Sequence, residues 1–257
     1  MIRIAAAGDV HFDRKSHGRL SNHFDDLQTK ADLLVLAGDL TQTGHPEEMR
    51  VLAEDLRKCP VPVVVVLGNH DYHMEKVPEV TKILEEAGVT VLERSAITLT
   101  IGGSTVGIAG AKGFGGGFIG ACGSDFGEPE MKSFMRHSKK EAQELEEVIK
   151  GLNVDYKVVL LHYSPTSQTL LGEKKEIYPF LGCYHLAEAV DYGKADIVFH
   201  GHAHGGFEKG ETPGKVPVRN VAQPVIRHAF NIYTLNKKAS THIAEERLEN
   251  SAYYSSH

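Results

Sequence analysis

The segment ADIVFHGHAHGG, residues 195–206, joins a short apolar run to three histidines within five positions. The run ADIVF predicts a buried β-strand, because it is short, apolar and bounded by polar residues. In an extended segment, residues i and i+2 point to the same side, so alternate histidines can face one object. Three neighbouring imidazoles repel one another when protonated. The pattern therefore indicates a metal site, for which the rest of the chain must supply further ligands.

Four other apolar runs end in the same way. Strands are predicted at 2–8, 33–38, 61–68 and 157–162, and each ends at or before polar side chains that can bind a metal or move a proton. Together with the opening segment, they offer Asp9, His11, Asp39, Asn69, His70, Asp71, His162, His202 and His204. Any one of the acidic or amide residues alone would be explained by a helix cap or a turn. Five strand ends with such residues indicate a shared site, because the carboxyl ends of parallel strands meet at one edge of a sheet.

The order of the elements predicts the fold. Helices are predicted near 21–30, 46–58, 76–88, 139–152 and 185–192, a hairpin at 97–110, and closing strands at 216–222 and 228–235. The glycine-rich stretch 112–137 is predicted to be irregular. We expect an α/β protein with two packed mixed β-sheets flanked by helices, as a single domain over residues 1–236. The tail, residues 237–257, has no clear apolar periodicity, and we expect it to be loosely ordered.

The composition excludes several classes of protein. The chain has 257 residues, 41% of them hydrophobic, and a formal net charge of −6, which argues against broad binding of nucleic acid or an anionic membrane. Its three cysteines form no CxxC pair, and this favours a reducing compartment. The first residues lack the basic and cleavage regions of a signal peptide. We expect a cytoplasmic protein without a membrane span.

The residue types indicate which ions the site would hold. Carboxylates and imidazoles without thiolates suit divalent Mn, Fe, Zn, Co or Ni. Seven candidate ligands are too many for one tetrahedral ion but suit two ions that share a bridging carboxylate. Such pairs promote in-line displacement at phosphorus.

The motifs GDVH, GD, GNHD, H and GHAH, in this order, resemble those of the calcineurin-like metallophosphoesterase family, whose pattern is DxH, GD, GNHD/E, H and GHxH. The resemblance extends over residues 9–204, and it implies a four-layer αββα sandwich. It implies one ion held by Asp9, His11, Asp39 and His204, and a second held by Asp39, Asn69, His162 and His202. It also implies that His70 is the catalytic histidine and that Asp71 orients its ring. His200 lies outside the pattern, and we expect a structural or supporting role for it.

The implied activity is hydrolysis of a phosphate ester by in-line attack of a hydroxide that bridges the two ions. His70 would donate a proton to the leaving oxygen or stabilise charge in the transition state. A phosphomonoesterase and a scaffold without activity on the same fold are the alternatives. A metallo-β-lactamase-type hydrolase is disfavoured, because the chain has no H-x-H-x-D-H run.

The leaving group must be recognised by other residues. The segments 112–137 and 163–184 are too long for ordinary connections, and such segments are often functional. They carry aromatic residues that can stack on a planar group. We expect Phe118 and Tyr178 to bind substrate, and the substrate to be a small phosphodiester or nucleotide rather than a protein or a long nucleic acid.

Overall fold

Two mixed β-sheets pack face to face in the computed structural model, which describes residues 1–236. The five-stranded sheet has the order β13 (Asn231–Leu235), β1 (Ile2–Ala7), β2 (Leu33–Ala37), β3 (Val63–Val66) and β4 (Thr90–Val91). The six-stranded sheet has the order β11 (Lys209–Glu211), β12 (Pro217–Asn220), β10 (Ile197–His200), β9 (Tyr156–Leu161), β6 (Ser104–Ala111) and β5 (Ser95–Ile101). The tail predicted from Lys237 lies outside the described residues.

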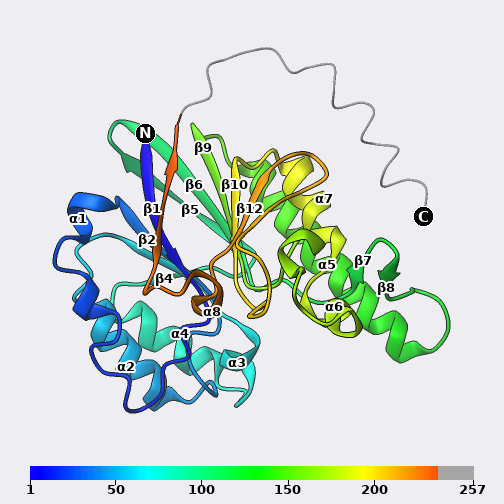
Figure 1. Ribbon diagram of the computed structural model, residues 1–257, viewed down its shortest axis with the longest axis horizontal. Coiled ribbons are helices and arrows are strands. Elements are labelled where there is room, and N and C mark those ends of the chain that lie inside the picture. Colours follow the sequence, from blue (N-terminus) through cyan, green and yellow to red (C-terminus); the bar gives the residue numbers. More distant parts are fainter. Residues whose placement is uncertain (237–257) are drawn as a thin grey trace.

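Helices cover the outer face of each sheet, which gives four layers (Figure 1). On the five-stranded sheet lie α1 (Leu27–Lys30), α2 (Pro46–Leu56) and α4 (Val77–Glu85). On the six-stranded sheet lie α5 (Pro129–Gly151) and α7 (Tyr184–Gly193). Shorter elements are η1 (Ser21–His23), α3 (Asn69–Tyr72), β7 (Gly117–Phe118), β8 (Ala121–Cys122), η2 (Ser167–Leu170), η3 (Lys175–Ile177), α6 (Tyr178–Leu181) and α8 (Gln223–Ile226). The predicted fold class is confirmed.

Side-chain alternation along the strands builds these layers. In β1, Ile2, Ile4 and Ala6 belong to the core between the sheets, while Ala5 and Ala7 face the helices. The strands β2, β3 and β10 are also buried along their length, and β9 is buried at every residue but Lys157. They therefore appear in the sequence as continuous apolar runs, as expected of strands that are covered on both faces.

The parallel strands carry the site. β1, β2 and β3 are parallel neighbours in one sheet, and β9, β10 and β12 are parallel neighbours in the other. Their carboxyl ends meet at one edge of the sandwich. Each candidate ligand follows one of these strands directly, except that no ligand follows β12.

Two predicted boundaries were wrong. α5 begins at Pro129, not near 139, so the last third of the stretch predicted to be irregular is helical. Pro129 and Glu130 are ordinary helix-start residues, but only Met135 and Ser138 are buried in the first ten positions, so the apolar periodicity is weak there. The helix expected at 21–30 is split into η1 and the single turn of α1.

Candidate metal centre

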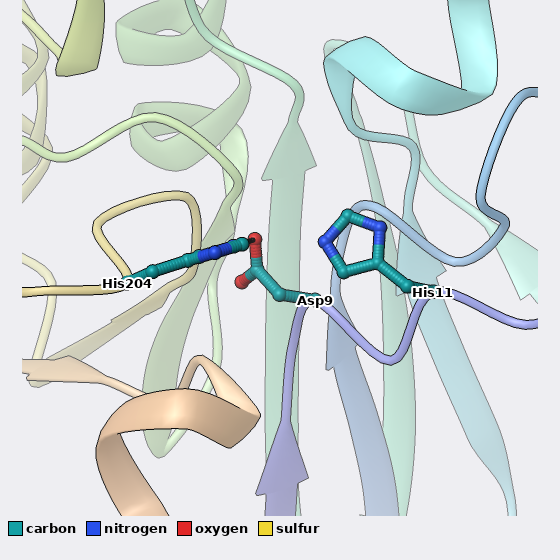
Figure 2. A group of neighbouring side chains, drawn as sticks. All are labelled: Asp9, His11 and His204. Carbon is teal, nitrogen blue, oxygen red and sulfur yellow. Dashed lines mark hydrogen bonds and ion pairs between the residues drawn. The ribbon is translucent and has the colours of Figure 1, made fainter.

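The structure brings the predicted ligands together at the carboxyl edge of the two sheets. Asp9, His11 and His204 form one group, and Asp39, His162 and His202 form another, with the ligand atoms of each group within 4.8 Å of one another. Figure 2 shows the Asp9 carboxylate between the rings of His11 and His204. Asn69 joins the second group, because its Oδ1 lies 2.9 Å from His162 Nε2. All seven expected ligands are therefore in one place.

Several of these residues have an unusual backbone conformation. Asp9, His11, Asp39 and His202 have φ values of 54°, 41°, 49° and 70°, in the left-handed region that non-glycine residues rarely adopt. Such conformations cost roughly 1–3 kcal/mol each and persist where the surrounding structure enforces them, often at functional sites. Four such residues among the seven expected ligands indicate that the backbone is bent to aim their side chains at a common site.

Two motif glycines permit this close approach. A Cβ atom at Gly68 would lie 2.1 Å from both the backbone nitrogen and Oδ1 of Asp39. A Cβ atom at Gly201 would lie 2.2 Å from Asp9 Oδ2. The glycines of GNHD and GHAH are thus required because an aspartate ligand occupies the space of a side chain.

The first group is centred on the buried carboxylate of Asp9. Its Oδ1 lies 2.9 Å from His204 Nε2, and the backbone N–H of His202 donates to both of its oxygens at 3.0 and 2.9 Å. Burial raises the pKa of Asp9 to about 6, opposed by the hydrogen bond from His204. That hydrogen bond in turn raises the pKa of His204, whereas burial lowers the pKa of His11. The carboxylate is poorly solvated, and this favours a bound cation.

The second group has lone pairs that face one another. The His162 ring is buried, and its Nδ1 lies 2.9 Å from the carbonyl oxygen of Ala37, to which it donates. Nε2 is then an acceptor, yet it faces Asp39 Oδ1 at 3.3 Å and Asn69 Oδ1 at 2.9 Å. Burial lowers the pKa of His162 well below its usual value and that of His202 to about 3, so protons do not relieve this arrangement. A divalent cation between these atoms would relieve the repulsion of their lone pairs. The residues therefore fit the ion that the motifs imply.

Asp39 lies between the two groups. Its Oδ1 faces His162, and its Oδ2 lies 3.9 Å from His11 Nε2. One carboxylate thus presents a different oxygen to each group. This is the arrangement that a bridging ligand requires.

His70 lies beside this bridge and reaches solvent. Its backbone N–H donates to Asp39 Oδ1 at 2.8 Å, its ring Nε2 lies 3.8 Å from Asp39 Oδ2, and its ring packs edge-on against His11. Its side chain is 38% exposed. His11, Asp39 and His70 also form a possible ligand group. The expected role of His70, as a catalytic residue that is not a metal ligand, stays a prediction.

The role expected for Asp71 was wrong. The His70 ring is held through Nδ1 by the backbone carbonyl of Gln42, at 2.8 Å. The buried carboxylate of Asp71 accepts four other hydrogen bonds, from Leu40 N, Thr41 N, Thr41 Oγ1 and Gly68 N, at 2.6–3.0 Å. Asp71 ties the loop after β2 to the loop after β3. No lone pair is left over for the ring of the neighbouring residue.

The contacts of Phe118 and Tyr178 do not support the expected role in substrate binding, which stays a prediction. Both are buried, their rings lie edge to face at 6.4 Å, and the Tyr178 hydroxyl donates to the Leu170 carbonyl. They fix their own segments to the protein. The exposed ring beside the site is that of Phe180, which is 62% exposed and whose carbonyl accepts from His202 Nε2 at 3.0 Å.

His200 is buried away from the ligand groups of the described chain. Its Nε2 pairs with Thr169 Oγ1 at 2.8 Å and its Nδ1 with the Gly201 carbonyl at 2.7 Å. Burial lowers its pKa to about 4, so the ring is neutral. The expected structural role agrees with these contacts.

Comparisons with known proteins agree with the geometry. The family described as "Calcineurin-like phosphoesterase" matches residues 2–206, so the chain belongs to this family of phosphoric ester hydrolases. A protein of Arcobacter nitrofigilis named "Probable glycerophosphodiester phosphodiesterase GpdQ" is 39% identical over 49 residues, which are 19% of this chain and 18% of that protein. A Caenorhabditis elegans protein named "Putative metallophosphoesterase F40B5.2" is 23% identical over 89% of this chain and 41% of that protein. The chain thus matches less than half the length of either relative.

A solved structure has the same fold. The phosphopantetheinyl hydrolase PptH of Mycobacterium tuberculosis aligns with a TM-score of 0.66 over 93% of this chain and 98% of its own, at 14% identity. The protein TT1561 of Thermus thermophilus aligns with a TM-score of 0.52 over 92% of this chain and 99% of its own, at 16% identity. These similarities concern the fold alone. Within residues 1–236, none of the helices combines the length and the apolar character needed to cross a bilayer.

Proposed function

We propose that this chain is a dinuclear metal-dependent phosphoesterase that hydrolyses a small phosphodiester or nucleotide. The observation that carries the proposal is the position of Asp39, whose two oxygens face His162 on one side and His11 on the other. Asp9, His11, Asp39 and His204 would hold one divalent ion, and Asp39, Asn69, His162 and His202 the other. Two such ions neutralise a phosphate ester and lower the pKa of a water molecule that attacks phosphorus.

The chain itself supplies a proton donor and the backbone groups that hold the ligands in place. The carbonyl of Gln42 accepts from His70 Nδ1, which leaves Nε2 at the exposed side of the ring to exchange a proton with the leaving oxygen. Backbone N–H groups fix the carboxylates, those of His202 on Asp9 and of His70 on Asp39. The ligands are thus preorganised by strand ends, which are rigid.

A series of aromatic rings leads outward from the second ligand group. Tyr163 lies 4.4 Å from the His202 ring, Phe114 lies 5.9 Å from Tyr163, and Phe134 lies 5.2 Å from Phe114. Phe180 lies 6.5 Å from Phe134. We assign the exposed ring of Phe180, at the outer end of this series, to the planar or apolar part of the leaving group, in the place first given to Tyr178. The net charge of −6 favours a small substrate over a long polyanion.

Metal analysis and paired substrates test the proposal. The purified chain, loaded with Mn²⁺, is expected to bind two ions and to hydrolyse bis-p-nitrophenyl phosphate faster than p-nitrophenyl phosphate. A preference for the monoester would replace the diesterase proposal with a phosphomonoesterase. Two bound ions without turnover of either ester, or of a panel of nucleotides and cyclic nucleotides, would favour the scaffold alternative.

A second pair of variants tests the role of Phe180. Phe180→Ala is expected to lower kcat/KM for a nucleotide substrate about tenfold, the effect of about 1.4 kcal/mol of lost stacking. It should spare a small alkyl phosphate, which has no planar leaving group. Phe126→Ala is the control, because Phe126 is 84% exposed and belongs to the other long segment. Equal effects of both variants, or none, would contradict the assignment.

A further inference from the structure

Lys112 is a buried cation beside the metal centre that the proposed chemistry does not use. It follows β6, only 9% of its surface is exposed, and its Nζ donates to the carbonyl of Gly113 at 2.9 Å. Three aromatic rings surround the ammonium, with centroids 5.2 Å away for Tyr72 and 5.1 Å for both Phe114 and Tyr163. These distances are typical of cation–π contacts.

The rings belong to segments that carry the metal-binding motifs. Tyr72 ends the GNHDY run after β3, and Tyr163 follows His162 after β9. β3 belongs to the five-stranded sheet, and β6 and β9 belong to the six-stranded sheet. The ammonium therefore gathers side chains from both sheets. The backbone carbonyl of Lys112 also accepts from His162 N and Tyr163 N, at 3.1 and 3.0 Å.

Tyr163 connects the Lys112 ammonium with His202, one of the expected metal ligands. Its ring packs on His202 at 4.4 Å and an angle of 47°, while the Phe180 carbonyl holds the same imidazole through Nε2. The ring of His202 is thus fixed on two sides. Burial raises the pKa of Tyr163 to about 12, so its hydroxyl stays neutral beside the site.

An apolar side chain would fill this space at lower cost. Burying an ammonium is unfavourable, and replacing buried charges by apolar residues of similar volume is often neutral or stabilising. Burial lowers the pKa of Lys112, opposed by the carboxylates of Glu141, Glu93 and Asp39 and reinforced by Arg94. Methionine could make sulfur–aromatic contacts with these rings, but it has no charge to attract the faces of all three.

We propose that Lys112 is a positioning residue of the metal centre: its ammonium draws together the faces of Tyr72, Phe114 and Tyr163, and thereby holds Tyr163 against His202. The inference rests on the proposed function in one respect, the role of His202 as a ligand of the second ion. Lys112 is not one of the expected ligands, and its Nζ donates to the carbonyl of Gly113.

Metal affinity and kinetics of three lysine variants test the proposal. Lys112→Met keeps the length of the side chain and removes the charge. It is expected to weaken binding of one of two Mn²⁺ ions to the metal-free chain about tenfold by titration calorimetry, and to lower kcat more than it changes KM. Lys112→Arg is expected to retain most of the Mn²⁺ affinity and most of kcat, because guanidinium also binds aromatic faces. Lys157→Met is the control, since Lys157 Nζ donates to the carbonyls of Ile149 and Gly193 at the opposite end of β9. It should change stability without changing Mn²⁺ affinity.

A double-mutant cycle with Tyr163→Leu shows whether Lys112 acts through the tyrosine. If it does, the double variant binds Mn²⁺ no more weakly than Tyr163→Leu alone. Additive losses, wild-type affinity in Lys112→Met, or equal losses in Lys157→Met overturn the proposal. Should Lys112→Met fail to fold, a folded Lys112→Arg variant that binds Mn²⁺ as weakly as Tyr163→Leu overturns it too. A wild-type chain that binds no Mn²⁺ overturns this inference and the proposed function together.

Discussion

Replacing Asp71 by asparagine separates a structural role for this carboxylate from a catalytic one. Each carboxylate oxygen accepts two hydrogen bonds: Oδ2 from Leu40 N and Gly68 N, and Oδ1 from Thr41 N and Thr41 Oγ1. Asparagine keeps one acceptor oxygen and places an NH2 group where the other stood. If that group faces Thr41, the hydroxyl can rotate to accept from it, and only Thr41 N–H is left without an acceptor. If the NH2 group faces Leu40 and Gly68 instead, the backbone N–H groups of both residues are left without an acceptor.

The less costly orientation fixes the expected magnitude. One buried N–H group without a partner costs about 1–3 kcal/mol. Burial and the nearby Asp39 carboxylate raise the pKa of Asp71 to about 6, so asparagine also removes an unfavourable charge at neutral pH. Asp71→Asn is therefore expected to lower the free energy of unfolding by at most about that amount, measured by urea denaturation of the metal-free chain. In a protein of this size, each kcal/mol corresponds to roughly 2–4 °C in Tm.

Asp55 offers a matched control. It is a buried aspartate in α2 whose oxygens also accept two hydrogen bonds each, from Gly18 N, Leu20 N, Ser21 N and Ser21 Oγ, at 2.9–3.2 Å. Burial of Asp55 is outweighed by hydrogen bonds from Leu20, Gly18 and Ser21, which lower its pKa. Asp55→Asn should therefore lower stability at least as much as Asp71→Asn and leave kcat unchanged. Asp71→Asn should also displace the loops that carry Asp39 and His70, and so reduce kcat without moving the pH profile. An Asp71→Asn variant with wild-type stability and a shifted pH profile would refute this reasoning. It would support the earlier expectation that Asp71 orients the His70 ring.

Three further predictions concern the metal centre. Asp39→Asn is expected to lower the Mn²⁺ content from two ions to one or none and kcat at least a hundredfold, because one carboxylate faces both ligand groups; elemental analysis that finds two ions and full turnover would contradict the bridge. His70→Ala is expected to lower kcat about 10²- to 10⁴-fold with both ions retained, as for the loss of a proton donor. Metal loss in this variant, comparable with that of His202→Ala, would instead place His70 among the ligands. Burial raises the pKa of Asp9 to about 6 and the hydrogen bond to Asp9 raises that of His204, so Mn²⁺ must displace protons from this pair at lower pH. Mn²⁺ affinity should therefore fall as the pH falls from 7 to 5, and calorimetry in buffers of different ionisation enthalpy counts the released protons. Affinity independent of pH over this range would show that neither group gives up a proton when the ion binds.

The ligands were predictable from sequence because regular structure fixes their positions. A buried strand ends where its apolar run ends, and parallel neighbours end at the same edge, so the residues after β1, β2, β3, β9 and β10 had to meet. The glycines beside them follow from the same packing, since Gly68 and Gly201 leave room for the aspartates of the facing loops. The meeting of the strand ends requires no knowledge of a loop conformation, whereas the role of the glycines becomes clear only from the structure.

The partners of Asp71 were not predictable in this way. Sequence proximity to His70 suggested that the carboxylate holds the adjacent ring, whereas the structure places it against backbone N–H groups some 30 positions away. A buried carboxylate accepts whatever donors the fold brings to it, and here the loop after β2 supplies three. The hydrogen bond that holds the His70 ring comes from a backbone carbonyl, that of Gln42, which no residue type reveals.

The roles of the aromatic residues in the two long segments were not predictable from sequence for a related reason. Phe118, Tyr178 and Phe180 all lie in segments without long regular elements, and in sequence each could cover a core or line a cleft. Phe118 and Tyr178 pack on each other, whereas Phe180, two residues after Tyr178, is exposed and its carbonyl accepts from His202. Burial thus decides which ring is available to a substrate. Variants of Phe118 or Tyr178 would therefore alter substrate binding indirectly, through the position of Phe180, and a loss of activity in them would not by itself identify a binding residue.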